Sequence, residues 1–174
     1  IATLKHFPGH GDVETDSHEN LPVINKPLKC LQEMELIPFQ KLGASADVIM
    51  TAHLLVKAFD QDHCSTLSKK TLDYLRNEIG FQGVIMTDSL VMKGVLKECD
   101  TIDEAAIYAL NAGCDILLFG GRQLIDGHVN LELSVNDIKR IQQSIIHAVK
   151  TGRVPLTRLD DAVQKILKLK EKYL

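Results

Sequence analysis

The stretch Gly83-Val84-Ile85-Met86-Thr87-Asp88 decides the fold class, because an apolar run of strand length ends there on a carboxylate. Nearly continuous apolar runs of this length are typical of strands that are covered on both faces in a parallel sheet. Three further runs of the same kind predict three more strands: Ile1–Lys5, Asp47–Ala52 and Cys114–Phe119.

Helical patterns separate and follow these runs. Leu28–Leu42 is amphipathic but contains Pro38, which predicts two short helices or one bent helix. Ser68 is a candidate N-cap for a helix that Gly80 ends. Three later helices are expected over Ile102–Ala112, Asn136–Lys150 and Thr157–Tyr173, the last with a capping-box pattern over Thr157–Asp160. Strands that alternate with helices predict an α/β fold with a parallel sheet.

The composition is that of a soluble globular domain. The chain has 174 residues, 45% hydrophobic and 25% charged, and its formal net charge is −3. These values give no sign of a nucleic-acid partner, and no apolar run reaches the roughly 20 residues of a membrane helix. Four cysteines without a CxxC pair favour a reducing, cytoplasmic setting. Because the first residue is Ile1, already in a strand pattern, we expect the chain to be part of a longer polypeptide.

Titratable residues stand at the ends of three predicted strands. Lys5 and His6 end the first, His53 follows the second and Asp88 follows the third. In parallel α/β folds, ligands bind at the carboxyl ends of the strands. The pattern therefore predicts a site there. Asp88 itself is either a turn-capping residue or a rigidly held carboxylate that serves as a nucleophile or a metal ligand.

The segment after the first strand, KHFPGHGDVETDSHENLP, is the densest in titratable groups. Asp16 and His18 are two positions apart, so the carboxylate can bond to one imidazole nitrogen and favour the protonated ring; a solvated surface loop is the alternative. The spacing of His6 and His10 suits two metal ligands on a helix, but the intervening Pro8 and the glycines disfavour a helix. A glycine-rich phosphate site is a further, weaker reading.

Two motifs carry a family resemblance. KHFPGHGDVETDSH resembles the signature of family 3 glycoside hydrolases in their β-N-acetylglucosaminidase branch, and GFQGVIMTDSLVM resembles the segment that carries the family's nucleophile. VIMTAH, which ends at His53, fits the same branch. The resemblance runs along essentially the whole chain and implies a single, partial catalytic domain of this family over residues 1–174.

The resemblance implies a partial TIM-type (β/α)8 barrel made of strands five to eight and their helices. It implies a retaining mechanism in which Asp88 is the nucleophile and His18, paired with Asp16, is the acid/base. Lys5 and His6 match residues that bond to the sugar hydroxyls, and we assign His53 to the same substrate-binding group. The implied substrate is a saccharide with terminal β-linked GlcNAc, such as a peptidoglycan fragment, and no metal or organic cofactor is expected.

The chain also departs from the family pattern in one respect. The first half of the family's barrel is not matched, and with it a carboxylate and an arginine that help to hold the sugar. The missing half is therefore an expected partner, and a non-catalytic fragment or sugar-binding module is an alternative function. A family 3 β-glucosidase is a second alternative, against which the DSH tripeptide argues, because the acid/base of that branch comes from another domain.

Overall fold

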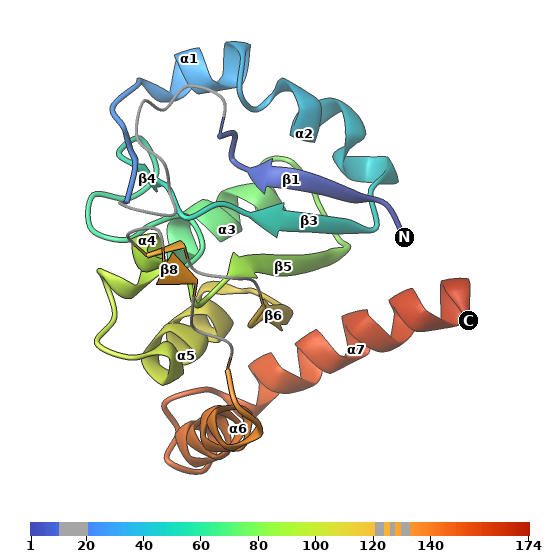
Figure 1. Ribbon diagram of the computed structural model, residues 1–174. Coiled ribbons are helices and arrows are strands. Elements are labelled where there is room, and N and C mark those ends of the chain that lie inside the picture. Colours follow the sequence, from blue (N-terminus) through green and yellow to red (C-terminus); the bar gives the residue numbers. More distant parts are fainter. Residues whose placement is uncertain (11–20, 121–123, 126–127, 130–132) are drawn as a thin grey trace.

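The computed structural model describes residues 1–10, 21–120, 124–125, 128–129 and 133–174. Its main sheet contains four parallel strands in the order β1-β3-β5-β6 (Figure 1). These are β1 (Thr3–Phe7), β3 (Val48–Thr51), β5 (Val84–Ser89) and β6 (Ile116–Leu118). The α/β class and the parallel sheet predicted from the sequence are confirmed.

Helices connect successive strands and follow the last one. They are α1 (Leu28–Glu33), α2 (Ile37–Leu42), the 3-10 helix η1 (Gly43–Ser45), α3 (Lys69–Asn77), α4 (Lys93–Leu96), α5 (Ile102–Ala112), α6 (Val135–Lys150) and α7 (Leu156–Tyr173). Two small sheets lie beside the main one: β2 (Val23–Ile24) pairs in parallel with β4 (Leu55–Val56), and β7 (Leu124–Ile125) pairs antiparallel with β8 (His128–Val129). None of the helices within these ranges is long and apolar enough to cross a membrane.

All four strands of the main sheet point the same way, so their carboxyl ends share one edge. In Figure 1 the arrows point toward the side where β4, α4 and β8 gather, and both chain termini lie on the opposite side. The residues at the carboxyl ends of β1, β3 and β5 therefore lie in one region of the molecule.

The predicted strands are found with shifted ends. The first runs over Thr3–Phe7 rather than ending at Lys5, because its pairing with β3 continues to Phe7, which is fully buried. The third continues to Ser89, so Asp88 lies inside the strand rather than in the loop after it. Both shifts lengthen the strands toward the carboxyl edge.

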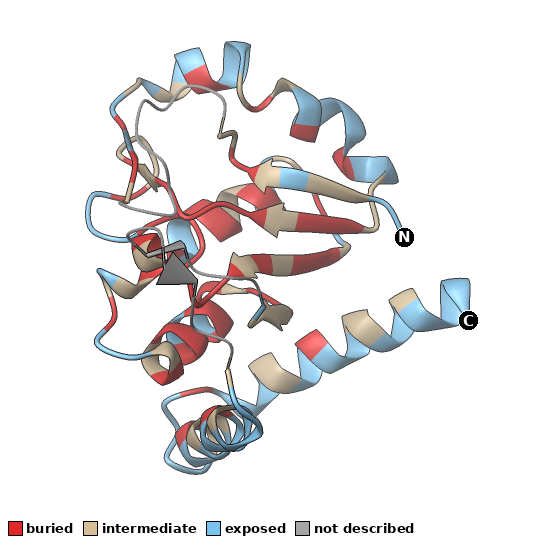
Figure 2. Ribbon diagram, viewed as in Figure 1, coloured by how far each residue is buried: buried red, intermediate tan, exposed pale blue. Residues whose placement is uncertain are grey.

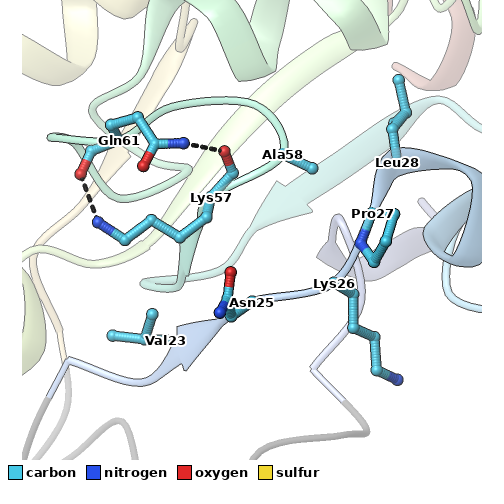
Figure 3. A pocket seen from close by; sticks show the side chains of 8 residues that line it. All are labelled: Val23, Asn25, Lys26, Pro27, Leu28, Lys57, Ala58 and Gln61. Atoms are coloured by element: carbon cyan, nitrogen blue, oxygen red, sulfur yellow. Dashed lines mark hydrogen bonds between the residues drawn. The ribbon is translucent and has the colours of Figure 1, made fainter.

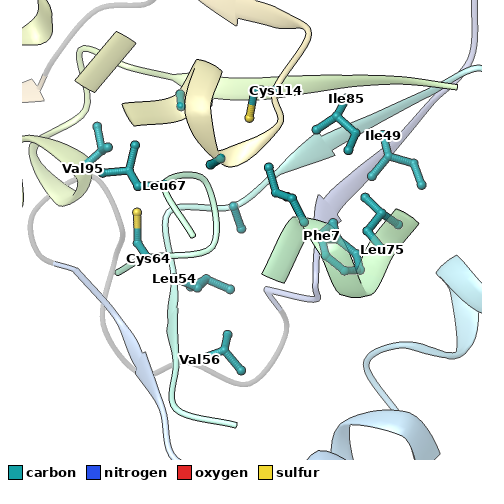
Figure 4. Packing of buried hydrophobic residues seen from close by; sticks show 14 of the residues in the cluster. Phe7, Ile49, Leu54, Val56, Cys64, Leu67, Leu75, Ile85, Val95 and Cys114 are labelled. Atoms are coloured by element: carbon teal, nitrogen blue, oxygen red, sulfur yellow. The ribbon is translucent and has the colours of Figure 1, made fainter. Parts of the chain in front are cut away.

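The hydrophobic core lies between the sheet and the connecting helices (Figure 4). Phe7, Ile49 and Ile85 come from three adjacent strands, and Leu75 from α3 packs with them; each is fully buried. Figure 2 shows that burial concentrates in β3, β5 and α5, whereas α7 is exposed along most of its length. Burial along β5 alternates beyond its start: Met86 and Asp88 are half-buried, while their neighbours are buried. The strands are therefore less covered on one face than the sequence predicted, and Asp88 lies on that more open face.

Most of the helix ends predicted from the sequence agree with the structure. The segment that contains Pro38 forms two helices, α1 and α2, and Pro38 lies in the first turn of α2. Ser68 caps α3 by accepting a hydrogen bond from the Thr71 N–H, and Gly113, with φ of 125°, ends α5.

The capping box predicted at Thr157 was wrong. Helix α7 begins one residue earlier, and Pro155 occupies its N-cap without a side-chain cap. The fixed φ of Pro155 suits the start of a helix, so Thr157 already lies inside the first turn. A capping box forms instead at the start of α6, between Ser134 and Asp137.

A buried carboxylate links the sheet to two helices. Asp115, directly before β6, accepts hydrogen bonds from Arg76 Nη2 of α3 and Arg158 Nη2 of α7, each at 2.7 Å. It also accepts a hydrogen bond from the Ile85 N–H at 2.9 Å. The side chain of Asp115 is completely buried and is the carboxylate that Arg76 and Arg158 share, while Arg158 also pairs with Asp161 at 2.9 Å.

We therefore predict that Asp115→Asn lowers the free energy of unfolding by about 3 kcal/mol, because it removes the counter-charge of Arg76 and leaves Arg158 paired with the exposed Asp161. Urea unfolding followed by circular dichroism measures this change. The matched control is Asp73→Asn, which removes an exposed carboxylate paired with Lys69 four residues away on α3. This control is expected to change the same quantity by less than about 0.5 kcal/mol. Equal effects of the two substitutions would contradict the assignment.

Candidate active site

His6 of β1 and Asp88 of β5 meet at the carboxyl edge of the sheet. His6 Nε2 lies 3.8 Å from Asp88 Oδ2, and the two side chains are 29% and 23% exposed. Strand β3 lies between β1 and β5, and neighbouring strands are about 4.8 Å apart, so this contact spans two strand spacings. The sheet brings together two side chains that the sequence separates by more than eighty residues, with both polar ends accessible.

The surroundings of His6 favour its neutral form. Burial lowers the pKa of His6, and the positive charge of Lys5 and the nearby His10 lower it further, while Asp88 opposes them. The rings of His6 and His10 lie 6.0 Å apart, edge to face. A neutral imidazole has one donor and one acceptor nitrogen, which suits hydrogen bonds to a sugar hydroxyl.

The carboxylate of Asp88 is fixed by its own strand. Its Oδ1 accepts a hydrogen bond from the Ser89 N–H at 2.7 Å. Strand β5 is tied to the neighbouring β6 segment on both sides of this position. The Thr87 hydroxyl accepts from the Leu118 N–H at 2.9 Å, and the Ser89 hydroxyl donates to the Gly120 carbonyl. The carboxylate therefore has one oxygen anchored and the other directed toward His6.

His53 is placed differently from its predicted role. It is 1% exposed, and both ring nitrogens bond to protein atoms. Nδ1 lies 2.9 Å from the Thr66 hydroxyl, and Nε2 lies 2.9 Å from the Ser89 carbonyl oxygen. Neither nitrogen is available to a sugar hydroxyl in this arrangement, so a direct substrate contact by His53 has no support in the geometry.

The other predicted site residues fall into two groups. Lys5 is exposed in β1 and close enough to lower the pKa of His6. Asp16 and His18 lie outside the described residues, so their predicted pairing stays a prediction. The described residues nearest to them in the sequence lie at the carboxyl edge. His10 packs beside His6, and the carbonyl of Pro22 accepts a hydrogen bond from the Leu55 N–H, which follows β3.

Thr66 and Ser89 belong to the site region but were missed from the sequence. Thr66 lies in an irregular segment between β4 and α3, and no motif distinguishes it. Ser89 could have been found, because it directly follows the candidate nucleophile in the predicted strand.

No metal site is present in the parts of the chain that the structure covers, since no group of three His, Cys, Asp or Glu side chains comes together there. A separate cavity of about 570 Å³ lies at the same edge of the molecule, between the segments around β2 and β4 and the start of α1 (Figure 3). Lys57 and Gln61 close one side of it through two hydrogen bonds, 2.8 and 2.6 Å long. Of the predicted site residues that the structure describes, none lines this cavity.

Comparison with known proteins decides the family. The sequence model of the glycosyl hydrolase family 3 N-terminal domain matches residues 1–169. The chain belongs to glycosyl hydrolase family 3. Among its family 3 relatives, β-hexosaminidase A of Pseudoalteromonas piscicida is 32% identical over 99% of this chain and 30% of its own length. The β-hexosaminidase of Tolumonas auensis is 37% identical over 74% of this chain and 40% of its own length.

Solved structures of family 3 proteins agree with this fold. A family 3 β-N-acetylglucosaminidase from Paenibacillus superposes with a TM-score of 0.85 and 35% identity, covering 97% of this chain and 30% of that one. A fungal multi-domain family 3 β-N-acetylglucosaminidase gives a TM-score of 0.86 and 32% identity over 99% of this chain and 20% of that one. The chain thus spans less than half the length of each of these relatives, and the predicted partial barrel is confirmed as the fold.

We predict that Asp88→Asn lowers the pKa of His6 further, because the Asp88 carboxylate is the neighbouring charge that raises it. NMR titration of the His6 ring protons measures this pKa. Asp73→Asn, on the exposed surface of α3, serves as the control and is expected to leave it unchanged. A pKa of His6 that stays constant or rises in Asp88→Asn would show that the two side chains are not neighbours in solution.

Proposed function

We propose that this chain is the part of a retaining β-N-acetylhexosaminidase that carries the nucleophile and the acid/base, and that it acts on saccharides with terminal β-linked GlcNAc. The observation that carries the proposal is the accessible Asp88 carboxylate, fixed at a strand end beside His6, in a family 3 domain. The names of the relatives support the sugar class, because they are β-hexosaminidases and β-N-acetylglucosaminidases.

The reaction has two steps in this proposal. In the first, Asp88 Oδ2 attacks the anomeric carbon, the bond from that carbon to the leaving oxygen breaks, and His18 gives its proton to that oxygen. A covalent glycosyl ester on Asp88 results. In the second, water attacks the same carbon, His18 accepts the water proton, and Asp88 leaves as a carboxylate. Asp16 keeps His18 protonated before the first step.

Lys5 and His6 hold the sugar while this occurs. The ammonium of Lys5 donates hydrogen bonds, and the neutral ring of His6 can both donate and accept them. The distance of 3.8 Å between His6 Nε2 and Asp88 Oδ2 is longer than a hydrogen bond, so both atoms remain available to the substrate. Contacts to hydroxyls near the anomeric carbon can strengthen as positive charge develops in the transition state.

The substrate class follows from the same resemblance. Peptidoglycan fragments with a terminal β-linked GlcNAc are the proposed natural substrates. The activity belongs to the complete protein in this proposal, because the relatives are more than twice as long as the matched segment.

The assay of this function uses an aryl β-N-acetylglucosaminide and the complete protein that carries this chain. Asp88→Ala is expected to reduce kcat by about 10⁴-fold or more, because no other group can form the ester. Asp62→Ala, an exposed carboxylate on the loop after β4, is the control and should retain wild-type kcat. Turnover that is insensitive to Asp88→Ala would sink the nucleophile assignment.

The acid/base assignment predicts a dependence on the leaving group. His18→Ala should reduce kcat by about 10²- to 10⁴-fold for a substrate with a poorly acidic phenol, because that oxygen needs a proton as it leaves. For a dinitrophenyl substrate, whose leaving group needs no proton, His18→Ala should reduce the rate of the first step much less. Equal losses in the first step for both substrates would argue against His18 as the acid.

A further inference from the structure

A side-chain bridge continues the pairing of β3 with β5 where the strands themselves stop pairing. The paired residues are Val48 with Val84, Ile49 with Ile85 and Met50 with Met86. The same offset places residue 53 opposite residue 89. Strand β3 ends at Thr51, and it is the His53 side chain, through Nε2, that reaches the Ser89 carbonyl at 2.9 Å. The imidazole therefore takes the place of a backbone hydrogen bond at the end of the sheet.

The partners of His53 fix its tautomer. The Ser89 carbonyl can only accept a hydrogen bond, so Nε2 must carry a proton. In a neutral ring Nδ1 then accepts, and the single proton of the Thr66 hydroxyl lies within reach of both Nδ1, at 2.9 Å, and the Ala52 carbonyl, at 3.1 Å. The Thr51 hydroxyl lies 2.9 Å from the Thr66 oxygen and can donate to it in turn. Burial lowers the pKa of His53, which agrees with the neutral ring.

This bridge ends on the residue that anchors the candidate nucleophile. Ser89 uses three groups at once: its N–H donates to Asp88 Oδ1, its carbonyl accepts from His53, and its hydroxyl donates to the Gly120 carbonyl. Removing the imidazole would release the Ser89 carbonyl, which belongs to the peptide unit next to the one whose N–H bonds to Asp88.

We propose that His53 is a positioning residue, whose Nε2–H bond to the Ser89 carbonyl holds the Asp88 carboxylate at the distance required for attack. This inference rests on the proposed function, since it assigns His53 an effect on the same reaction. It differs from the substrate-binding role expected from the sequence, because a residue that contacts the sugar would affect substrate binding. A positioning residue instead affects the chemical step, where a misplacement of about 1 Å can reduce the rate by about 10²-fold.

The tautomer is tested first, by NMR on the complete protein labelled with ¹⁵N-histidine. The expected result is a neutral His53 ring with the proton on Nε2, unchanged across the pH range in which exposed histidines titrate. A His53 ring protonated on Nδ1 alone, or one that titrates like a free histidine, would show that the hydrogen bond to the Ser89 carbonyl is absent. This test requires no measurement of activity.

The kinetic test compares His53→Leu with His53→Gln on an aryl β-N-acetylglucosaminide. The leucine side chain removes the donor, whereas the terminal amide of glutamine can still donate to the Ser89 carbonyl. For His53→Leu we expect kcat to fall by about 10²-fold and KM to change by less than about threefold. The kcat of His53→Gln should be about tenfold higher than that of His53→Leu.

Two controls separate positioning from loss of fold. Leu75→Ala truncates a fully buried side chain of α3 and leaves the hydrogen bonds of Ser89 in place, so its kcat per folded molecule should equal that of the wild type. If His53→Leu does not fold, Thr66→Val and Thr66→Ser form the second pair: valine removes the hydroxyl donor to Nδ1 and should lower kcat, while serine keeps it and should not.

The outcomes distinguish this inference from the proposed function. A kcat of His53→Leu within about threefold of the wild type overturns the positioning role, and so does a raised KM with unchanged kcat, which would restore direct substrate contact. If the wild type shows the Nε2–H tautomer but no turnover of any aryl β-N-acetylglucosaminide, the proposed function is wrong and His53 is only a structural bridge.

Discussion

The position of β5 between β3 and β6 is the constraint on which the rest of the structure depends. Strand β5 pairs with β3 as far as Met86 and with β6 as far as Ser89, so its carboxyl end is held by β6 and by the His53 side chain rather than by a loop. Asp88 can therefore be half-exposed and still rigid, a combination that a nucleophile requires and a loop residue rarely has. The half-buried face of β5, with Met86 and Asp88, is also the face on which His6 approaches from β1.

The buried ionic cluster that stabilises the fold and the residues of the candidate site lie at opposite ends of the strands. At the amino side of the sheet, Asp115 joins Arg76 and Arg158 in a buried ionic cluster that ties α3 and α7 to the strands. At the carboxyl side, the described polar groups include His6, His53, Thr66 and Ser89 around the accessible Asp88 carboxylate, with Lys5 nearby. Two guanidinium groups compensate the charge of Asp115, whereas one Asp88 oxygen accepts the Ser89 N–H and the other lies 3.8 Å from His6.

Much of this arrangement follows from the sequence, because strand ends and helix boundaries are local signals. Apolar runs locate all four main strands, and Asp88 follows one of them closely enough to be noticed. The burial of His53 is not local: it depends on Thr66, in an irregular segment, and on a carbonyl thirty-six residues further along the chain. The two-residue strands β2 and β4 and the single turn α4 are too short for any periodicity to reveal. The family resemblance supplies the roles of Asp16 and His18, which lie outside the described residues.

The central claim is that Asp88 forms the covalent bond to the sugar. A slow mechanism-based glycosyl fluoride of the GlcNAc type, incubated with the complete protein and followed by peptide mass spectrometry, tests this claim most directly. If Asp88 is the nucleophile, the peptide that contains it gains one glycosyl mass, and Asp88→Asn is not labelled. A label on a different residue, or none while the protein still hydrolyses the substrate, would contradict it.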